Sequence, residues 1–127
     1  MSKVAVLAVQ EAVQIDQARV TEIVTELGEG AGQTLLIAAM EQLALALRQT
    51  LRAAAQDDGA QVLLHVEHLS RLAWQVGLVT LAGVAVDVGR CVDSHNRQAM
   101  AATLSRLERV ANSSLMGIWD DDLPIEP

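Results

Sequence analysis

The sequence predicts an all-α protein: an antiparallel up-down four-helix bundle with an additional N-terminal helix covering one end or side. Apolar residues recur at spacings of three, four and seven along most of the chain, which is the period of an α-helix. The chain contains two Trp and no Phe or Tyr, so its core must be aliphatic, and such a core suits packed helices. Strand signals are weak, because the valine-rich run 4–9 is short and other β-branched residues fall on helical faces.

A chain of 127 residues fits one domain that buries roughly two-thirds of its unfolded surface, and it leaves no room for a second domain. We expect a lead over about 1–12, the bundle over 13–118 and an acidic tail over 119–127. Trp119 is expected to pack at the end of the bundle.

The first helix is expected over about 9–27, and the glycine-rich run 28–32 should end it. The second is expected over about 33–56, where Asp57, Asp58 and Gly59 follow. Its core-facing stripe consists of Leu36, Met40, Leu43, Leu47 and Leu51.

Three more helices follow at short intervals. Asp58 is a suitable N-cap for a helix over about 59–76, which Gly77 breaks. The next helix, over about 78–94, is apolar around most of its circumference and should lie centrally in the bundle. The last is expected over about 97–116.

The charge and the cysteine content limit which partners the protein can be expected to bind and in which cellular compartment it can be expected to occur. Nine basic against sixteen acidic residues give a net charge of −7, which repels nucleic acid and anionic lipid, so neither is expected as a partner. The longest uncharged stretch, 72–86, is shorter than the roughly 18 apolar residues of a membrane span. The single Cys91 forms no internal disulfide, and the first apolar run is too short for a signal peptide. We therefore expect a cytoplasmic protein.

Residues that carry chemistry concentrate around His65, Glu67 and His68. Two histidines three apart lie on neighbouring helix faces, but no second Cys or His pair accompanies them, so no metal site is expected. Cys91 lies in a helix predicted to be buried, without a base or cationic cluster beside it in the sequence. No phosphate-binding glycine loop is present, and no cofactor is expected.

The outward face of the third helix carries the candidate binding residues: Leu64, Glu67, His68, Arg71 and Trp74. A Leu and a Trp pointing away from the core need an explanation. Either the N-terminal helix or a partner subunit covers them, or they form a protein-docking patch around Glu67 and Arg71. These two charged residues are four apart in the order that favours an ion pair on a helix.

The spacing of residues 69–96 is the strongest part of a wider likeness. The positions that carry it are Leu69, Ala73, Val76, Gly77, Leu81, Ala82, Ala85, Val88 and Asn96, and upstream Glu26, Leu27, Gly28, Leu36 to Leu51, Asp58, Val62 and Val66. In this layout the chain, from about 15 to 115, resembles the histidine-containing phosphotransfer (HPt) domain of bacterial two-component phosphorelays. The resemblance implies the same helical fold.

In that family an exposed histidine begins a His-x-Leu-Lys-Gly motif and accepts a phosphoryl group from a receiver-domain aspartate. Aligned without gaps on Leu69 and Gly77, the acceptor position holds Glu67, the lysine position Ser70 and the glycine position Arg71. All three signature residues are missing. The resemblance therefore implies a pseudo-phosphotransferase that docks a response-regulator receiver domain or a sensor kinase, with Glu67 placing negative charge where phosphohistidine would place it.

Two alternatives remain open. A one-residue shift nominates His68 as the phosphoacceptor, with Arg71 in place of the lysine, although Leu72 then occupies the glycine position. His65 is a weaker candidate, because its angle turns it toward the core. In the other alternative the protein has a structural role, and the exposed Leu and Trp form the seam of a homodimer.

Overall fold

The computed structural model describes residues 11–122, with side chains to residue 118. In this range the chain forms five helices: α2 (Gln17–Leu27), α3 (Glu29–Ala55), α4 (Gly59–Gln75), α5 (Val79–Asp93) and α6 (Arg97–Asp122). Extended pairing in these residues is limited to one isolated bridge between Ile15 and Leu78. The prediction of an all-α protein is confirmed.

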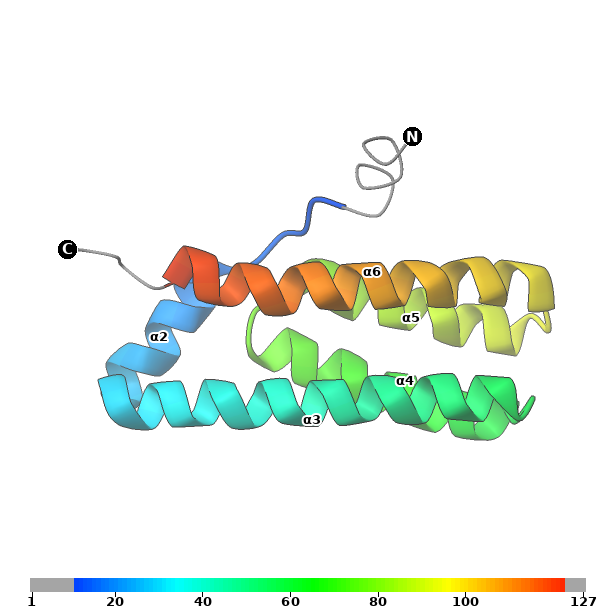
Figure 1. The fold of residues 1–127 in the computed structure, drawn as a ribbon, viewed down its shortest axis with the longest axis horizontal. Helices are drawn as coiled ribbons and strands as arrows, with labels where there is room; N and C mark the ends of the chain where they lie inside the picture. The colour runs from blue at the N-terminus through cyan, green and yellow to red at the C-terminus, as the bar shows by residue number, and fades with distance from the viewer. Residues whose placement is uncertain (1–10, 123–127) are drawn as a thin grey trace.

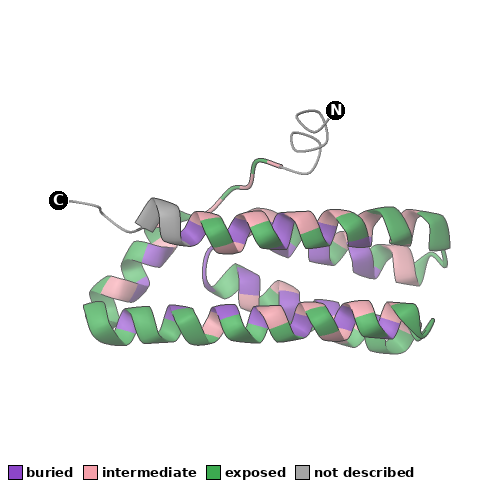
Figure 2. Cartoon of the chain, in the orientation of Figure 1, coloured by how far each residue is buried: buried purple, intermediate pink, exposed green. Residues whose placement is uncertain are grey.

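The helices form a bundle-like arrangement in which consecutive helices are neighbours. α4 packs against α3 and α5, α5 packs against α6, and α2 contacts α3. Helices α3 to α6 run side by side and reverse direction at each turn, while α2 crosses one end (Figure 1). Buried residues line the facing sides of the helices, and exposed residues cover their outer sides (Figure 2).

The core is aliphatic, as the composition predicts. Its largest fully buried side chains include Leu69, Leu78, Leu81, Leu107 and Ile118. The fourth predicted helix was expected to lie centrally; α5 packs between α4 and α6, and α4 in the same way packs between α3 and α5, so α5 has no special central position. Its buried residues are Leu81, Ala82, Val84, Ala85, Val88 and Gly89.

The turns after α3, α4 and α5 share one construction. Each helix ends at a residue in the left-handed conformation, namely Asp57, Gly77 and His95 with φ of 56°, 84° and 55°. The backbone N–H groups of this residue and the next bond back to carbonyls of the last turn, which is the Schellman arrangement. The residue after it opens the next helix. Asp58 accepts from the Gln61 N–H, which confirms its predicted role as an N-cap.

The predicted first helix over 9–27 is wrong in its N-terminal part. Residues 11–16 are not helical, and α2 begins at Gln17 because the Asp16 side chain caps it by accepting from the Arg19 N–H at 3.2 Å. Residues 9 and 10 lie outside the described part of the chain.

Residues 11–16 form a strap across the bundle. The Asp16 N–H donates to the Gly77 carbonyl at 2.7 Å, beside the turn between α4 and α5. Farther along, Arg106 on α6 donates two hydrogen bonds, of 3.0 and 2.8 Å, to the Glu11 carboxylate. This hydrogen bonding raises the pKa of Arg106 above its ordinary value, so the guanidinium stays charged.

The glycine-rich run 28–32 was expected to separate two helices along its whole length, but only Gly28 is non-helical. Gly28, at φ 87°, separates the two helices, and α3 begins directly at Glu29. Gly32 lies inside α3, where a Cβ atom would stand 2.9 Å from the Cα of Val24. This glycine therefore allows α2 and α3 to approach closely rather than ending a helix.

The last helix is longer than predicted. α6 continues from the expected end near residue 116 to Asp122, so the first part of the predicted acidic tail is helical. Trp119 was expected to pack at the end of the bundle, but its side chain lies outside the described part of the structure. Residues 123–127 of the predicted tail also lie outside it.

Among the described helices, α3 is long and apolar enough to cross a membrane. Length and composition alone are weak evidence, because core helices of soluble proteins pass the same test. One side of α3 is buried against the rest of the bundle, through Gly32, Leu36, Met40, Leu43, Ala46, Thr50 and Ala53.

Replacing Gly77 by Ala should lower the free energy of unfolding by roughly 2 kcal/mol or more. The new side chain meets both the cost of a left-handed backbone and the Asp16 carbonyl oxygen, 2.8 Å from the Cβ position. Gly83→Ala is the matched control, because Gly83 is helical with open space around it, and it should raise stability by about 0.5–1 kcal/mol. Urea unfolding followed by circular dichroism measures both, and equal effects would contradict this account.

Candidate functional site

The candidate binding residues lie on α4, which two neighbours hold in place. α4 packs between α3 and α5 and buries Val62, Val66, Leu69 and Ala73. Because the helical period places every third or fourth residue on one side, the opposite side faces solvent. Its C-terminal end is held by Arg19 of α2, whose Nε donates to the Gln75 carbonyl at 2.8 Å. A guanidinium at this end also complements the negative end of the helix dipole.

The structure exposes all five candidate residues. Glu67, His68 and Arg71 are exposed, and the apolar side chains of Leu64 and Trp74 are 56% and 67% exposed. The N-terminal helix does not cover them, contrary to the first of the expected explanations. α2 reaches only the edge of Trp74, where Asp16, Arg19 and Trp74 line a shallow hollow.

The charged side chains of this face are not engaged with each other. Among the ion pairs of residues 11–118, Glu67 and Arg71 do not form the pair that their spacing favours. Ser70 points to the side instead, where its hydroxyl donates to the Ala82 carbonyl on α5 at 3.2 Å. Ser70, which the resemblance aligns with the family's lysine, thus links α4 to α5. The charged side chains of Glu67 and Arg71 remain exposed to solvent.

The two histidines of α4 differ in access. His68 is exposed, whereas His65 is half-buried on the side nearer the core. In the described part of the chain, no cluster of three or more His, Cys, Asp or Glu residues is arranged to hold a metal ion.

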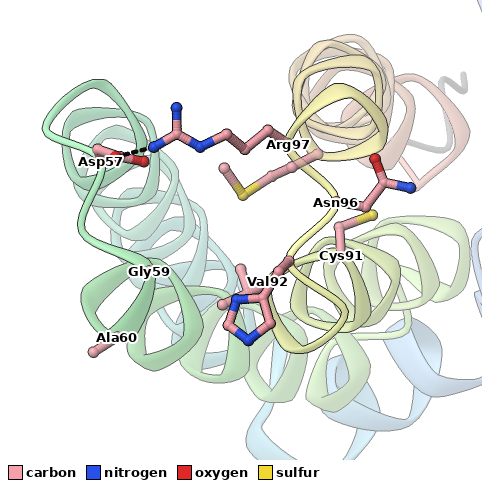
Figure 3. Close-up of a pocket in the computed structure, with 9 residues that line it drawn as sticks. Asp57, Gly59, Ala60, Cys91, Val92, Asn96 and Arg97 are labelled. Carbon is pink, nitrogen blue, oxygen red and sulfur yellow. Dashed lines mark hydrogen bonds and ion pairs between the residues drawn. The ribbon is translucent and has the colours of Figure 1, made fainter.

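A second hollow, which the sequence did not indicate, lies at the other end of α4 (Figure 3). It has a volume of about 360 Å³ and is enclosed by the turns after α3 and α5. Asp57 and Arg97 form an ion pair across it, although they are 40 residues apart in the sequence. Cys91 also lines it, and its sulfur lies 3.7 Å from the Thr103 hydroxyl. Local sequence patterns carry no signal for a hollow formed by two distant turns.

Comparison of the chain with protein-family models, curated proteins and solved structures gave no match.

Trp74→Ala should change the free energy of unfolding by less than about 0.5 kcal/mol, because the indole ring buries little surface in the folded chain. Leu69→Ala, on the buried side of the same helix, should lower it by about 2–5 kcal/mol. Thermal or urea denaturation of the two variants tests this contrast. A large loss in Trp74→Ala would mean that the ring supports the fold and is not free for a partner.

Proposed function

We propose that the chain is an HPt-like four-helix bundle, α3 to α6, with α2 as the additional N-terminal helix. In this proposal it acts in the cytoplasm as a docking module of a two-component phosphorelay. It binds a response-regulator receiver domain or a sensor kinase without transferring phosphate. The observation that carries the proposal is the solvent-facing side of α4, where exposed Leu64 and Trp74 accompany the free charges of Glu67 and Arg71.

The apolar part of this surface supports binding to a protein. A tryptophan that is 67% exposed on a rigid helix offers a large apolar area at small conformational cost. Leu64 lies nearly three helical turns earlier and extends the apolar area along the helix. Charged side chains between and beside such anchors supply orientation and specificity rather than most of the affinity.

The polar part supports binding without chemistry. At the position of the family's acceptor histidine, Glu67 presents a carboxylate, which supplies negative charge without an imidazole nitrogen. The Ser70 hydroxyl bonds to α5, so this position offers no cation to offset a phosphoryl group. Arg71 adds a large side chain where the family has glycine. Together these residues favour a partner that binds this surface of α4 without transferring a phosphoryl group to it.

Trp74→Ala should weaken binding to a cognate receiver domain by more than about 1 kcal/mol, because it removes the aromatic anchor. Met116→Ala is a matched control, since Met116 on α6 is 66% exposed and lies outside the face. Titration calorimetry against a panel of receiver domains and kinase fragments measures both. Equal affinities for Trp74→Ala and the unmodified protein would remove this face as the docking surface.

A second candidate function uses His68 as a phosphoacceptor. The observation that favours it is the exposure of His68, with Arg71 one helical turn later on the same side of α4. In this reaction an imidazole nitrogen attacks the aspartyl phosphate of a receiver domain. The N–P bond forms, the carboxylate leaves, and the arginine offsets the charge of the phosphoryl group.

Incubation with phosphorylated receiver domains distinguishes the two functions, with acid-labile phosphate followed by phosphorus NMR. The docking function predicts no phosphohistidine signal, together with binding that depends on Trp74. A signal that disappears in His68→Gln and persists in His65→Gln would instead establish a phosphocarrier. It would also overturn the proposal of binding without transfer.

A further inference from the structure

Helix α3 buries one side in the core, but it also carries large apolar side chains that are exposed to solvent. In the most apolar 18-residue stretch of α3, only 28% of the residues are buried. Leu35, Ile37 and Leu45 are between 39% and 48% exposed, although large aliphatic side chains usually lie inside. In the described part of the chain no other helix covers the side of α3 that carries Leu45.

The same side carries charges without partners. Glu41, Leu45, Arg48 and Arg52 follow one another at spacings of four, three and four, so they form one stripe along α3. The positions three and four residues from Glu41 on either side are Ile, Ala, Ala and Leu, which offer it no cation. In the described structure neither Glu41 nor the two arginines belong to an ion pair.

We propose that this stripe is a self-association surface, on which α3 of a second copy of this chain docks in antiparallel orientation about a two-fold axis near Leu45. In that orientation Glu41 lies opposite the helical turns that carry the partner's Arg48 and the partner's Arg52. The two-fold axis repeats this contact, so each dimer contains it twice. Leu45 lies at the centre of the seam, with Ile37 along its edge.

The charge order along α3 selects the occupant and its direction. The stripe is acidic toward its N-terminal half and basic toward its C-terminal half, so two antiparallel copies complement each other. A parallel pair would instead place Glu41 against the same carboxylate of the partner. Since α3 ends ten residues after Leu45, two antiparallel copies overlap over residues 35–55, a seam of about 30 Å with nearly three turns on each side of the axis. The net charge of −7 disfavours an anionic lipid surface as the occupant.

Sedimentation velocity of the full chain over a range of concentrations tests the association. We expect a concentration-dependent dimer, and Leu45→Glu should convert it to a monomer because two carboxylates then meet at the axis. Leu64→Glu is the matched control on α4, and it should leave the dimer intact. Loss of the dimer in Leu64→Glu but not in Leu45→Glu would place the seam on α4 and overturn the proposal.

Charge exchange tests the direction of pairing. Glu41→Arg and Arg48→Glu should each weaken the dimer about tenfold, since each change replaces attraction by repulsion at two symmetric places. The double variant restores complementarity and should recover most of the affinity. Independent, additive effects of the two changes would contradict the antiparallel arrangement.

Cross-linking with a short bismaleimide fixes the register. In a Cys91→Ser background, Leu45→Cys should cross-link two chains efficiently. Ala38→Cys should not, because in this register its two copies lie about 20 Å apart along the seam, 14 residues at 1.5 Å each. Cross-linking of both variants would show a parallel pair and overturn the proposal.

A chain that stays monomeric at every concentration also overturns it. If that monomer binds zwitterionic lipid vesicles through Leu45, α3 contacts a membrane instead. This surface is independent of the proposed docking function, so Trp74→Ala should remain dimeric whether or not it binds a receiver domain.

Discussion

The arrangement of the helices depends on the backbone of Gly77. Its left-handed conformation ends α4, its successor opens α5, and its carbonyl receives the N–H of Asp16. The strap from residue 11 to 16 lies so close that a Cβ atom at this position would stand 2.8 Å from the Asp16 carbonyl oxygen and would have to displace it. One glycine therefore fixes the antiparallel pairing of α4 and α5 and the point at which the N-terminal segment joins them. Because α4 also packs against both α3 and α5, its outer side is presented from a helix that is supported along its length.

The sequence predicted what local patterns encode. The aliphatic core, the cap at Asp58 and the buried side of α5 follow from side-chain periodicity and from the chemistry of helix ends. Where the prediction was wrong, long-range contacts decide the structure. The strap leaves the helical conformation because its hydrogen-bond partners lie 61 to 95 residues away in the sequence, and Gly32 serves a contact with Val24 instead of a turn.

The candidate site, too, was predictable from the sequence only in part. Periodicity predicts which α4 residues face outward, since exposure on a helix follows from angle alone. It does not predict how side chains use that exposure: Glu67 and Arg71 do not pair, and Ser70 turns to a backbone carbonyl on α5. Spacing along one helix also says nothing of a hollow enclosed by two turns that lie 40 residues apart.

Sharing a residue between the end of one helix and the start of the next leaves no slack in the three turns. One residue inserted there would rotate the following helix by roughly 100° about its axis and turn its apolar stripe out of the core. Length variation in descendants of this chain should therefore be confined to the ends, before residue 11 and after the last core residue of α6. The fold therefore constrains the length of these turns more tightly than their residue types.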